Sequence, residues 1–452
     1  MNFLFLHQNF PGQYKHLAPT FAAVAGSRVV AMGERKSISP ADTKVEYRPY
    51  PSPKGATAAT HHYIRDLEAA VRRGQVTARE AFRLRQEGFI PHVIFAHPGW
   101  GDALYLKDIF PESRLVNLFE FFYRSRGSDL NFDAEFPAVA DDALRVRSKN
   151  AINLLSLDSC DWGVSPTEWQ KRQYPEIYHP KISVIHDGVD TQVIRPLADR
   201  AVTIKEIGLT LTARDEVVTY VSRNLEPYRG FHSFMRALPM VLERRPKARV
   251  LIVGGNQVSY GRPPKNHPNW RAAMLAELEG KLDLSRIHFF GKVPYDVFQA
   301  VLQVSSAHIY LTYPFVLSWS MLEAMASGCA LIGSRTAPVE EVITHGQNGL
   351  LADIFNPAEI ADRIVEALAS PDRNRAMRER ARQTVIERYD LRTKALPAFV
   401  QLVNTLVQRR PAVQVAKPAP EPTPEPPPPA PLPDAAESSA DNARTKPKSK
   451  RR

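Results

Sequence analysis

The sequence predicts two doubly wound α/β domains, each with a parallel sheet between layers of helices, followed by a disordered tail. Three observations lead to this prediction. The 452 residues are too many for one compact core, since a domain has about 150 residues. Short apolar runs alternate with amphipathic helical stretches, and this pattern starts again near residue 216. From residue 411 onward, proline, alanine, glutamate and serine dominate.

The first predicted domain comprises residues 1–195. It begins with a strand over 2–7, a loop over 8–14 and a helix over 15–25. Strands that alternate with helices favour a parallel sheet, because each helix returns the chain to the same edge. The further strands are expected over 28–32, 93–96, 115–119 and 163–164.

The second predicted domain comprises residues 196–390 and begins with a strand over 216–222, a loop over 224–230 and a helix over 231–243. Asn356, Pro357 and Glu359 have the order of an N-cap, a first-turn proline and a capping-box acid, which predicts a helix to residue 368. The further strands are expected over 249–253, 287–291, 308–311 and 329–333. A helix at about 391–410 is a candidate to pack back on the first domain.

Composition narrows the class of protein. The proline-rich, basic residues 411–452 cannot bury enough apolar surface to fold, so a disordered tail is expected. The two cysteines, Cys160 and Cys329, lie in apolar surroundings, which suits a reducing compartment. The apolar start is too short for a signal peptide, and no run approaches the ~20 residues of a membrane-spanning helix. We therefore expect a soluble, cytoplasmic protein.

The formal net charge of +11 indicates attraction to anions such as nucleoside diphosphates or anionic lipids. No zinc-finger spacing, RNP-like strand or KH loop is present, so nucleic acid is not an expected partner. One or two helices are expected over 61–86, and they carry six arginines. A solvated helix face is the favoured interpretation, and a surface for an anionic membrane or a lipid-linked acceptor is the alternative. These arginines are Arg65, Arg72, Arg73, Arg79, Arg83 and Arg85.

Candidate site residues follow the predicted strands, because ligands of parallel sheets bind at the carboxyl ends of the strands. Gly12 in the first loop allows either close approach to a ligand or a tight turn. Arg223 and Arg229 share one loop and together suit a diphosphate. Glu323 lies within an apolar helix, where either a ribose diol or a salt bridge to Arg223 or Arg335 would satisfy it.

Two polar residues end strands of the first domain. His97 opens the stretch 97–102, and Glu120 follows an apolar run. One such residue alone is more often structural, but two at neighbouring strand ends favour a function. Pairing of Glu120 with Arg124 or Arg126 is the structural alternative.

These motifs resemble the retaining glycosyltransferases of family 4, whose GT-B fold consists of two Rossmann-like domains facing each other across a cleft. The resemblance extends over about residues 1–410. Its strongest part is 321–328, which is similar to the family's LEAMA-x-G helix. The stretch 223–230 has Arg-x5-Arg-Gly where the family usually has Arg-x5-Lys-Gly. Residues 184–190 and 341–350 resemble the family's NGVD crossing and its E-(I/V)-(I/V)…G…G-L segment.

The resemblance implies a nucleoside-diphosphate sugar as donor. Arg223 and Arg229 would bind its diphosphate, Glu323 would hold its ribose, and its base would lie near 291–294. Further substrate-binding residues that the resemblance implies are Val293, Val316, Leu317, Ser318 and Glu341.

Two positions depart from the family's pattern. Counting back from Glu323 puts Phe315 at the first position of the family's Glu-x7-Glu pair, so the donor sugar loses a carboxylate there. Glu120 stands where the family usually has histidine. Both departures affect the sugar side of the site, and the nucleotide side is intact.

The expected activity is hexosyl transfer, with retention of configuration, to a hydroxyl of a glycan or lipid-linked glycan, as in bacterial polysaccharide biosynthesis. The residues expected to act in catalysis are Arg223, Arg229, Glu120 and His97. The sequence has no Asp-x-Asp, so we expect neither a metal ion nor a cofactor; the arginines and a helix N-terminus would stabilise the leaving group. The alternatives are another GT-B enzyme, such as an epimerase, or a non-catalytic sugar-nucleotide-binding protein.

Overall fold

The structure, a computed structural model, describes residues 1–38, 44–369 and 371–408. The described residues fall within one compact unit, Met1–Pro411. The predicted tail, 411–452, lies outside the described residues.

The first sheet has seven parallel strands in the order β3-β2-β1-β4-β5-β6-β7. Successive side chains of β1 alternate between two cores, with Phe3 and Phe5 in one and Leu4 and Leu6 in the other. Both faces of this sheet are therefore covered, as the sequence predicts for a doubly wound domain. The strands are β1 (Asn2–Leu6), β2 (Arg28–Gly33), β3 (Glu46–Pro49), β4 (Val93–Ala96), β5 (Arg114–Leu118), β6 (Trp162–Ser165) and β7 (Ile182–Val184).

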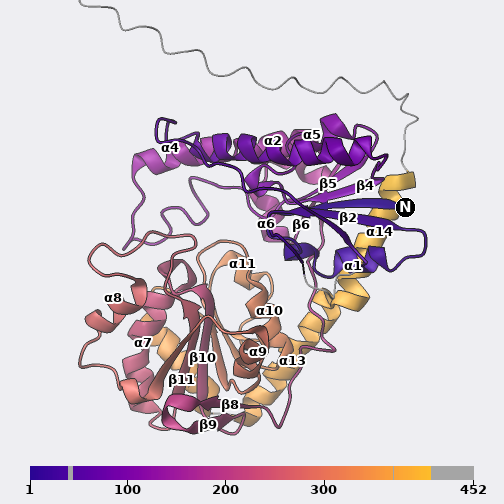
Figure 1. Cartoon of the computed structure of the whole chain (residues 1–452). Coiled ribbons are helices and arrows are strands. Elements are labelled where there is room, and N and C mark those ends of the chain that lie inside the picture. Colours follow the sequence, from indigo (N-terminus) through magenta and orange to yellow (C-terminus); the bar gives the residue numbers. More distant parts are fainter. Residues whose placement is uncertain (39–43, 370, 409–452) are drawn as a thin grey trace, which may run out of the picture. The chain divides into compact units, whose positions relative to one another are not determined.

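Helices cover the two faces of this first sheet (Figure 1). Residues of α2, α3 and α5 belong to one core, and residues of α1 and α14 belong to the other. The last described helix, α14, thus packs on the first domain, with the rings of Phe399 and Phe95 6.2 Å apart. The helices are α1 (Leu17–Ala22), α2 (Arg65–Gln86), α3 (Leu106–Ile109), α4 (Ala140–Lys149), α5 (Ala151–Ser159), α6 (Glu168–Gln173) and α14 (Leu396–Gln408), with the short helices η1 (Gly12–Tyr14), η3 (Pro98–Trp100) and η4 (Glu176–Lys181).

The second sheet has six parallel strands in the order β12-β11-β10-β13-β14-β15. A short antiparallel hairpin, β8–β9, precedes it. The strands are β8 (Ala201–Ile204), β9 (Leu209–Thr212), β10 (Val217–Asn224), β11 (Arg249–Gly255), β12 (Ile287–Gly291), β13 (Ala307–Tyr310), β14 (Leu331–Ser334) and β15 (Leu350–Ala352).

Helices again lie on both faces of this second sheet (Figure 1), which confirms the predicted second Rossmann-like domain. Successive residues of β13 illustrate this, because Ile309 belongs to the core on one face of the sheet and Tyr310 to the core on the other. The helices are α7 (Phe231–Arg244), α8 (Trp270–Glu277), α9 (Tyr295–Gln303), α10 (Trp319–Ala326), α11 (Ala337–Glu340), α12 (Pro357–Ala369) and α13 (Pro371–Tyr389), with η5 (Lys205–Ile207), η6 (Pro227–Arg229), η7 (Leu284–Arg286) and η8 (Leu391–Ala395).

The chain crosses between the two sheets after β7 and returns after α13. Val189 and Leu391 hold the two crossings together, since the N–H of Leu391 donates to the carbonyl of Val189 over 2.9 Å. Gly188 has φ +90°, and a Cβ there would lie 2.8 Å from the Cα of Leu391. Glycine is therefore required at this position, where the two crossings touch.

A third connection is the segment of residues 128–136 between β5 and α4, which we call the strap. Its Asp133 is buried and accepts hydrogen bonds from Tyr313 and, over 3.1 Å, from Nε2 of His232. Glu135 forms an ion pair with Arg236 at 2.7 Å. Because Tyr313 follows β13 and because His232 and Arg236 lie on α7 of the second domain, the strap joins the two domains. These bonds account for Asp133, Glu135 and His232, whose arrangement otherwise resembles a set of metal ligands.

Candidate active site

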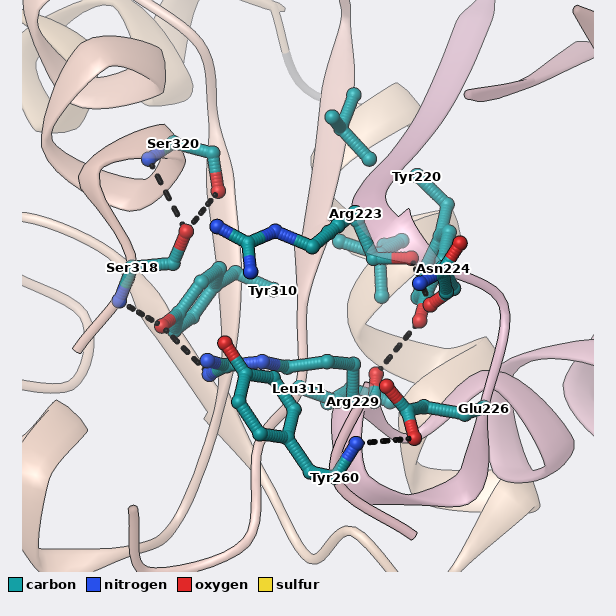
Figure 2. A pocket seen from close by; sticks show the side chains of 13 residues that line it. Tyr220, Arg223, Asn224, Glu226, Arg229, Tyr260, Tyr310, Leu311, Ser318 and Ser320 are labelled. Atoms are coloured by element: carbon teal, nitrogen blue, oxygen red, sulfur yellow. Dashed lines mark hydrogen bonds between the residues drawn. The ribbon is translucent and has the colours of Figure 1, made fainter. Parts of the chain in front are cut away.

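A cavity of about 90 Å³ lies at the carboxyl ends of β10 and β13. It is where a parallel sheet is expected to bind its ligand. Figure 2 shows its lining, in which polar side chains converge from three loops. The lining side chains named in that view are Tyr220, Arg223, Asn224, Glu226, Arg229, Tyr260, Tyr310, Leu311, Ser318 and Ser320.

Arg229 is fixed in the wall of this cavity. Its Nη1 donates to Oγ1 of Thr312 over 2.8 Å and to the carbonyl of Val316 over 3.1 Å. Its guanidinium lies 5.3 Å from the ring centroid of Tyr260, a cation–π distance. Arg229 is 9% exposed, so it is a buried, pre-oriented cation.

Arg223 differs from Arg229, because it is exposed and makes no side-chain hydrogen bond or ion pair with the residues that the structure describes. In Figure 2 the two guanidinium groups extend in the same direction, toward the loop that carries Ser318 and Ser320. Neither guanidinium forms an ion pair with a carboxylate of the described residues, so the two together create a site for an anion.

The N-terminus of α10 adds to this positive site. Ser318 caps the helix, and its side chain accepts a hydrogen bond from the N–H of Ser320 over 3.4 Å. The N–H of Ser318 donates to the hydroxyl of Tyr310 over 2.7 Å, which fixes the loop before the helix. The helix dipole and its free N–H groups therefore favour a negative charge near Ser318 and Ser320.

Glu226 is the acid nearest to the two arginines in the sequence, but it binds backbone N–H groups and not the arginines. It is buried, and its carboxylate accepts hydrogen bonds from the N–H groups of Ser259, Tyr260 and Gly261 over 2.9 to 3.1 Å. These bonds hold Tyr260 against Arg229. Sequence reasoning missed Tyr260, although its loop follows β11 at the same edge of the sheet as the predicted site.

Glu323 lies on α10 and forms neither of the two salt bridges considered from the sequence. Its Oε1 accepts a hydrogen bond from the hydroxyl of Tyr295 over 2.7 Å, and Arg335 pairs with Glu359 instead. Burial raises the pKa of Glu323, and the Tyr295 hydroxyl and the charge of Lys15 offset part of this rise. Glu323 is thus a buried carboxyl whose hydrogen-bond partner among the described residues is a surface tyrosine.

The first domain contributes a second group of polar side chains at the ends of its strands. Nε2 of His97 lies 3.4 Å from Oε2 of Glu120, and Gln13 donates to Oε1 of Glu120 over 3.1 Å. The ring of His97 stacks on Trp100, with centroids 4.2 Å apart. Arg124 donates instead to the carbonyls of Gln173 and Arg172, so it is not the partner of Glu120.

The charges of this second group are set by burial and contact. Burial acts to raise the pKa of Glu120, but the contacts with His97 and Gln13 outweigh it and hold the pKa below its usual range. Burial, together with the nearby His97, lowers the pKa of His7 to about 3. Gly12 belongs to this group because a Cβ there would lie 2.6 Å from the His7 ring. At neutral pH the group therefore consists of a carboxylate beside a neutral His7.

Phe315 is 6% exposed and belongs to an aromatic cluster with Phe121 and Trp169 of the first domain. Its ring centroid lies 4.5 Å from that of Phe121 and 4.8 Å from that of Tyr260. The side chain that replaces the family's first acidic residue thus fills apolar space between the two domains.

Several of the predicted residues lie elsewhere. Glu341 accepts hydrogen bonds from the N–H groups of Glu168 and Trp169, over 2.9 and 2.6 Å, and so caps α6 of the first domain. Leu317 is buried in a core of the second domain, and Val293 packs against another core. For Leu317 the backbone is what remains to contact a ligand, whereas Val293 is partly exposed.

Two doubly wound domains, with an arginine-lined cavity at the edge of the second sheet, define the GT-B class of proteins. The chain belongs to the family 4, or group 1, glycosyltransferases. The family described as "Glycosyl transferase family 4 group" matches residues 25–194, and "Glycosyl transferases group 1" matches residues 207–384.

The chain is similar to the D-inositol 3-phosphate glycosyltransferase of Corynebacterium urealyticum, with 27% identity over 51% of this chain and 54% of that relative. The chain thus spans about half the length of the curated relatives that it matches. Its fold is that of sucrose-phosphate synthase from Thermosynechococcus elongatus, with a TM-score of 0.66, 14% identity, and coverage of 90% and 99% of the two chains. Anabaena HepE, solved in complex with UDP-glucose, gives a TM-score of 0.60 at 15% identity, with coverage of 90% and 100%.

No helix among the described residues is long and apolar enough to cross a membrane.

Proposed function

We propose that this protein transfers a sugar from a nucleoside-diphosphate sugar to an acceptor hydroxyl, with retention of configuration and without a metal ion. The observation that carries the proposal is the pair Arg223 and Arg229 beside the N-terminus of α10. Among the described residues neither arginine forms an ion pair, and the carboxylate in the lining, Glu226, is bonded to backbone N–H groups instead. Membership of a glycosyltransferase family and a fold shared with a protein that holds UDP-glucose support it.

The arginines would stabilise the leaving group. As the bond between the anomeric carbon and the phosphate oxygen breaks, negative charge grows on the diphosphate. Arg229 is already oriented by Thr312 and Val316, and Arg223 is free to close on the phosphate. Such fixed donors cost little reorganisation when the charge develops.

Glu323 would hold the ribose. Among the described residues its carboxylate has one hydrogen-bond partner, the hydroxyl of Tyr295, whereas a ribose diol offers two hydroxyl donors. Tyr295 is 51% exposed and can turn away into solvent when the donor enters.

Glu120 and His97 would act on the sugar and acceptor side. In a same-face reaction the acceptor oxygen forms the new bond to the anomeric carbon, and its proton passes to the departing phosphate oxygen. The ionised Glu120 would stabilise the positive charge that grows at the anomeric carbon, with His97 and Gln13 fixing its position.

A thermal-shift panel of nucleoside diphosphates and their sugars, followed by turnover with glycan acceptors, tests the proposal. A ligand at about 100 times its dissociation constant should stabilise the protein by about 2.7 kcal/mol. Release of the nucleoside diphosphate that requires an added acceptor supports a transferase. Release without an acceptor would indicate an epimerase-like or hydrolytic enzyme, and binding without release would indicate a binding protein.

Metal independence is tested separately. Donor turnover should persist in excess EDTA, because the arginines and the α10 N-terminus take the place of a cation. Loss of turnover on chelation, with rescue by magnesium or manganese, would contradict this part of the proposal.

The acceptor side of the proposal includes a glycan or lipid-linked glycan and a peripheral contact with an anionic membrane. The structure weakens the case for a membrane contact through α2. Four of its arginines already form ion pairs with carboxylates, namely Arg72, Arg73, Arg83 and Arg85. Arg79 is exposed and remains available. Sedimentation with anionic vesicles that exceeds sedimentation with neutral ones would support it, with a chain ending before residue 411 as the control for the basic tail.

A further inference from the structure

A small second cavity, of about 10 Å³, lies at the carboxyl edge of the first sheet. Most of its wall is apolar and comes from β4, β5, β6 and α14. Three polar residues complete it, namely Gln13, Tyr14 and Asp187. A volume of this size admits one hydroxyl group or one water molecule.

Tyr14 brings an unused hydrogen-bonding group to this cavity. Its side chain is 3% exposed, and its hydroxyl has no hydrogen-bond partner in the part of the chain that the structure describes. Buried hydroxyl groups are normally paired, so an unpaired one beside a cavity points to a ligand. Burial, together with the nearby Asp187, raises the pKa of the Tyr14 phenol, so it stays a donor.

Asp187 lies on the crossing between the two sheets. Its Oδ2 accepts a hydrogen bond from Nε1 of Trp319 over 2.8 Å, and Trp319 is the first residue of α10. Oδ1 receives no hydrogen bond from the described residues. Gln13 connects this second cavity to the pair His97 and Glu120, because its amide donates to Glu120. Gln13 and Asp187 are both partly exposed, so a solute can reach them.

We propose that Gln13, Tyr14 and Asp187 form an acceptor subsite, which binds a hydroxyl group of a polyhydroxylated acceptor such as a sugar or cyclitol. Tyr14 donates to that hydroxyl and Asp187 binds it from the other side, while Glu120 faces the reacting end of the same acceptor. Trp319 couples the subsite to α10, whose N-terminus faces the donor phosphate. This inference rests on the proposed transfer function and names the substrate class on its acceptor side.

The charge on Asp187 is expected to change near neutral pH. Burial raises its pKa to about 7; the Trp319 bond opposes the rise, and the Glu120 carboxylate adds to it. The charged and titratable groups that face Asp187 are Glu120, His97, Lys15 and Tyr14. Asp187 therefore accepts from a bound hydroxyl above this pH and donates to it below.

The test uses the full chain with ¹⁵N-labelled tryptophan, in which the indole of Trp319 is assigned through Trp319→Phe. The probes are glycerol, D-glucose and myo-inositol, each titrated in the presence of UDP. We expect a saturable shift of the Trp319 indole signal with at least one probe, with binding weakened by about tenfold in Asp187→Asn and Tyr14→Phe. Asp187→Asn keeps the acceptor for Trp319, so a purely structural role predicts no change.

Asp190→Asn is the matched control, because Asp190 lies three residues further along the same crossing and pairs with Arg392. It should bind the probes as the wild type does. Without a probe, the indole signal should titrate near pH 7 in the wild type and stay constant in Asp187→Asn.

No saturable shift with any of the three polyols would overturn the subsite, and so would wild-type affinity for the probes in both Asp187→Asn and Tyr14→Phe. Either result would leave intact a protein that still binds and turns over a sugar nucleotide. Loss of UDP stabilisation in the wild type, by contrast, counts against the proposed function itself.

Discussion

Arg223 lies at the end of β10 and Arg229 in η6 just after it, and their surroundings give the two arginines different roles. Arg229 is buried and holds Thr312, Val316 and Tyr260 together. Arg223 is exposed and has no partner to lose among the described residues. Arg229 therefore contributes to stability as well as to binding, whereas Arg223 is free to serve the ligand alone.

Arg223→Ala should weaken binding of the nucleoside diphosphate by about 10-fold or more, the worth of one charge-assisted hydrogen bond, without lowering the melting temperature. Arg229→Ala should lower both the affinity for the nucleoside diphosphate and the melting temperature. Calorimetric titration with a nucleoside diphosphate and with its nucleoside separates the phosphate contribution, and Arg214→Ala serves as an exposed control outside the cavity. Equal losses for nucleoside and diphosphate would mean that the loop does not bind phosphate.

Glu120→Gln should lower the rate of transfer strongly while donor binding and melting temperature stay nearly unchanged. Glutamine keeps the shape, and its one amide oxygen can still accept a hydrogen bond from either Gln13 or His97, but it removes the charge that matters in the transition state. Steady-state kinetics with kcat and donor KM measured separately provide the test. Glu176→Gln, at an exposed position on η4, is the control, and wild-type turnover in Glu120→Gln would make Glu120 a structural residue.

At the scale of elements, the apolar runs of the central strands predict both sheets, because a strand buried on both faces must be apolar throughout. The edge elements escape this reasoning. β3 (Glu46–Pro49) is polar and partly exposed, and the hairpin β8–β9 has short alternating strands, so neither stands out as an apolar run. Strands of four residues are too short for a single-sequence pattern to distinguish them from loops.

The candidate site divides in the same way. Arg223 at the end of β10 meets Arg229 and Ser318, which follow strands, in one cavity as expected. Tyr260, Glu226 and Tyr295 could not be assigned, because their roles depend on contacts between loops distant in sequence. Glu341 shows the converse, since a motif residue is used to cap α6.

Phe315 leads to a prediction at this scale, because it joins the loop before α10 to the first domain's aromatic residues. Phe315→Ala should cost about 3 kcal/mol of unfolding free energy through lost packing, and Phe315→Leu about 1 kcal/mol. Urea unfolding followed by tryptophan fluorescence measures both. A stable alanine variant with altered donor preference would show instead that the ring contacts the sugar.

For the molecule as a whole, the strap adds a third connection between the two sheets beside the crossings at Val189 and Leu391. Its carboxylates, with Asp142 just after it, face cations or hydrogen-bond donors of the second domain. The strap also contacts two of the three loops of the donor cavity, because Tyr228 donates to Asp129 and Tyr313 to Asp133. Opening of the domains would therefore disturb the donor loops.

Asp133→Asn tests how much the strap holds the molecule together. Burial acts to raise the pKa of Asp133, but the hydrogen bonds from His232, Tyr313 and the Glu135 N–H outweigh it and lower the pKa below its usual value. A group whose pKa is lowered on folding stabilises the protein above its unfolded pKa, about 3.9, and this contribution disappears as pH falls through the folded pKa. The variant should therefore lose about 2 kcal/mol at pH 7, as expected for charge-assisted bonds, and progressively less below pH 4.

Scanning calorimetry of wild type and Asp133→Asn between pH 7 and pH 3.5 measures this difference, with Asp158→Asn on the exposed face of α5 as the control. The gap in melting temperature between wild type and variant should narrow in acid, because the unfolded wild-type chain then binds a proton on Asp133 that the folded chain does not. A gap that stays constant with pH would mean that asparagine fails through shape and not through charge. No gap at pH 7 would mean that the strap does not hold the two domains, and the crossings at Val189 and Leu391 would then be the connections that do.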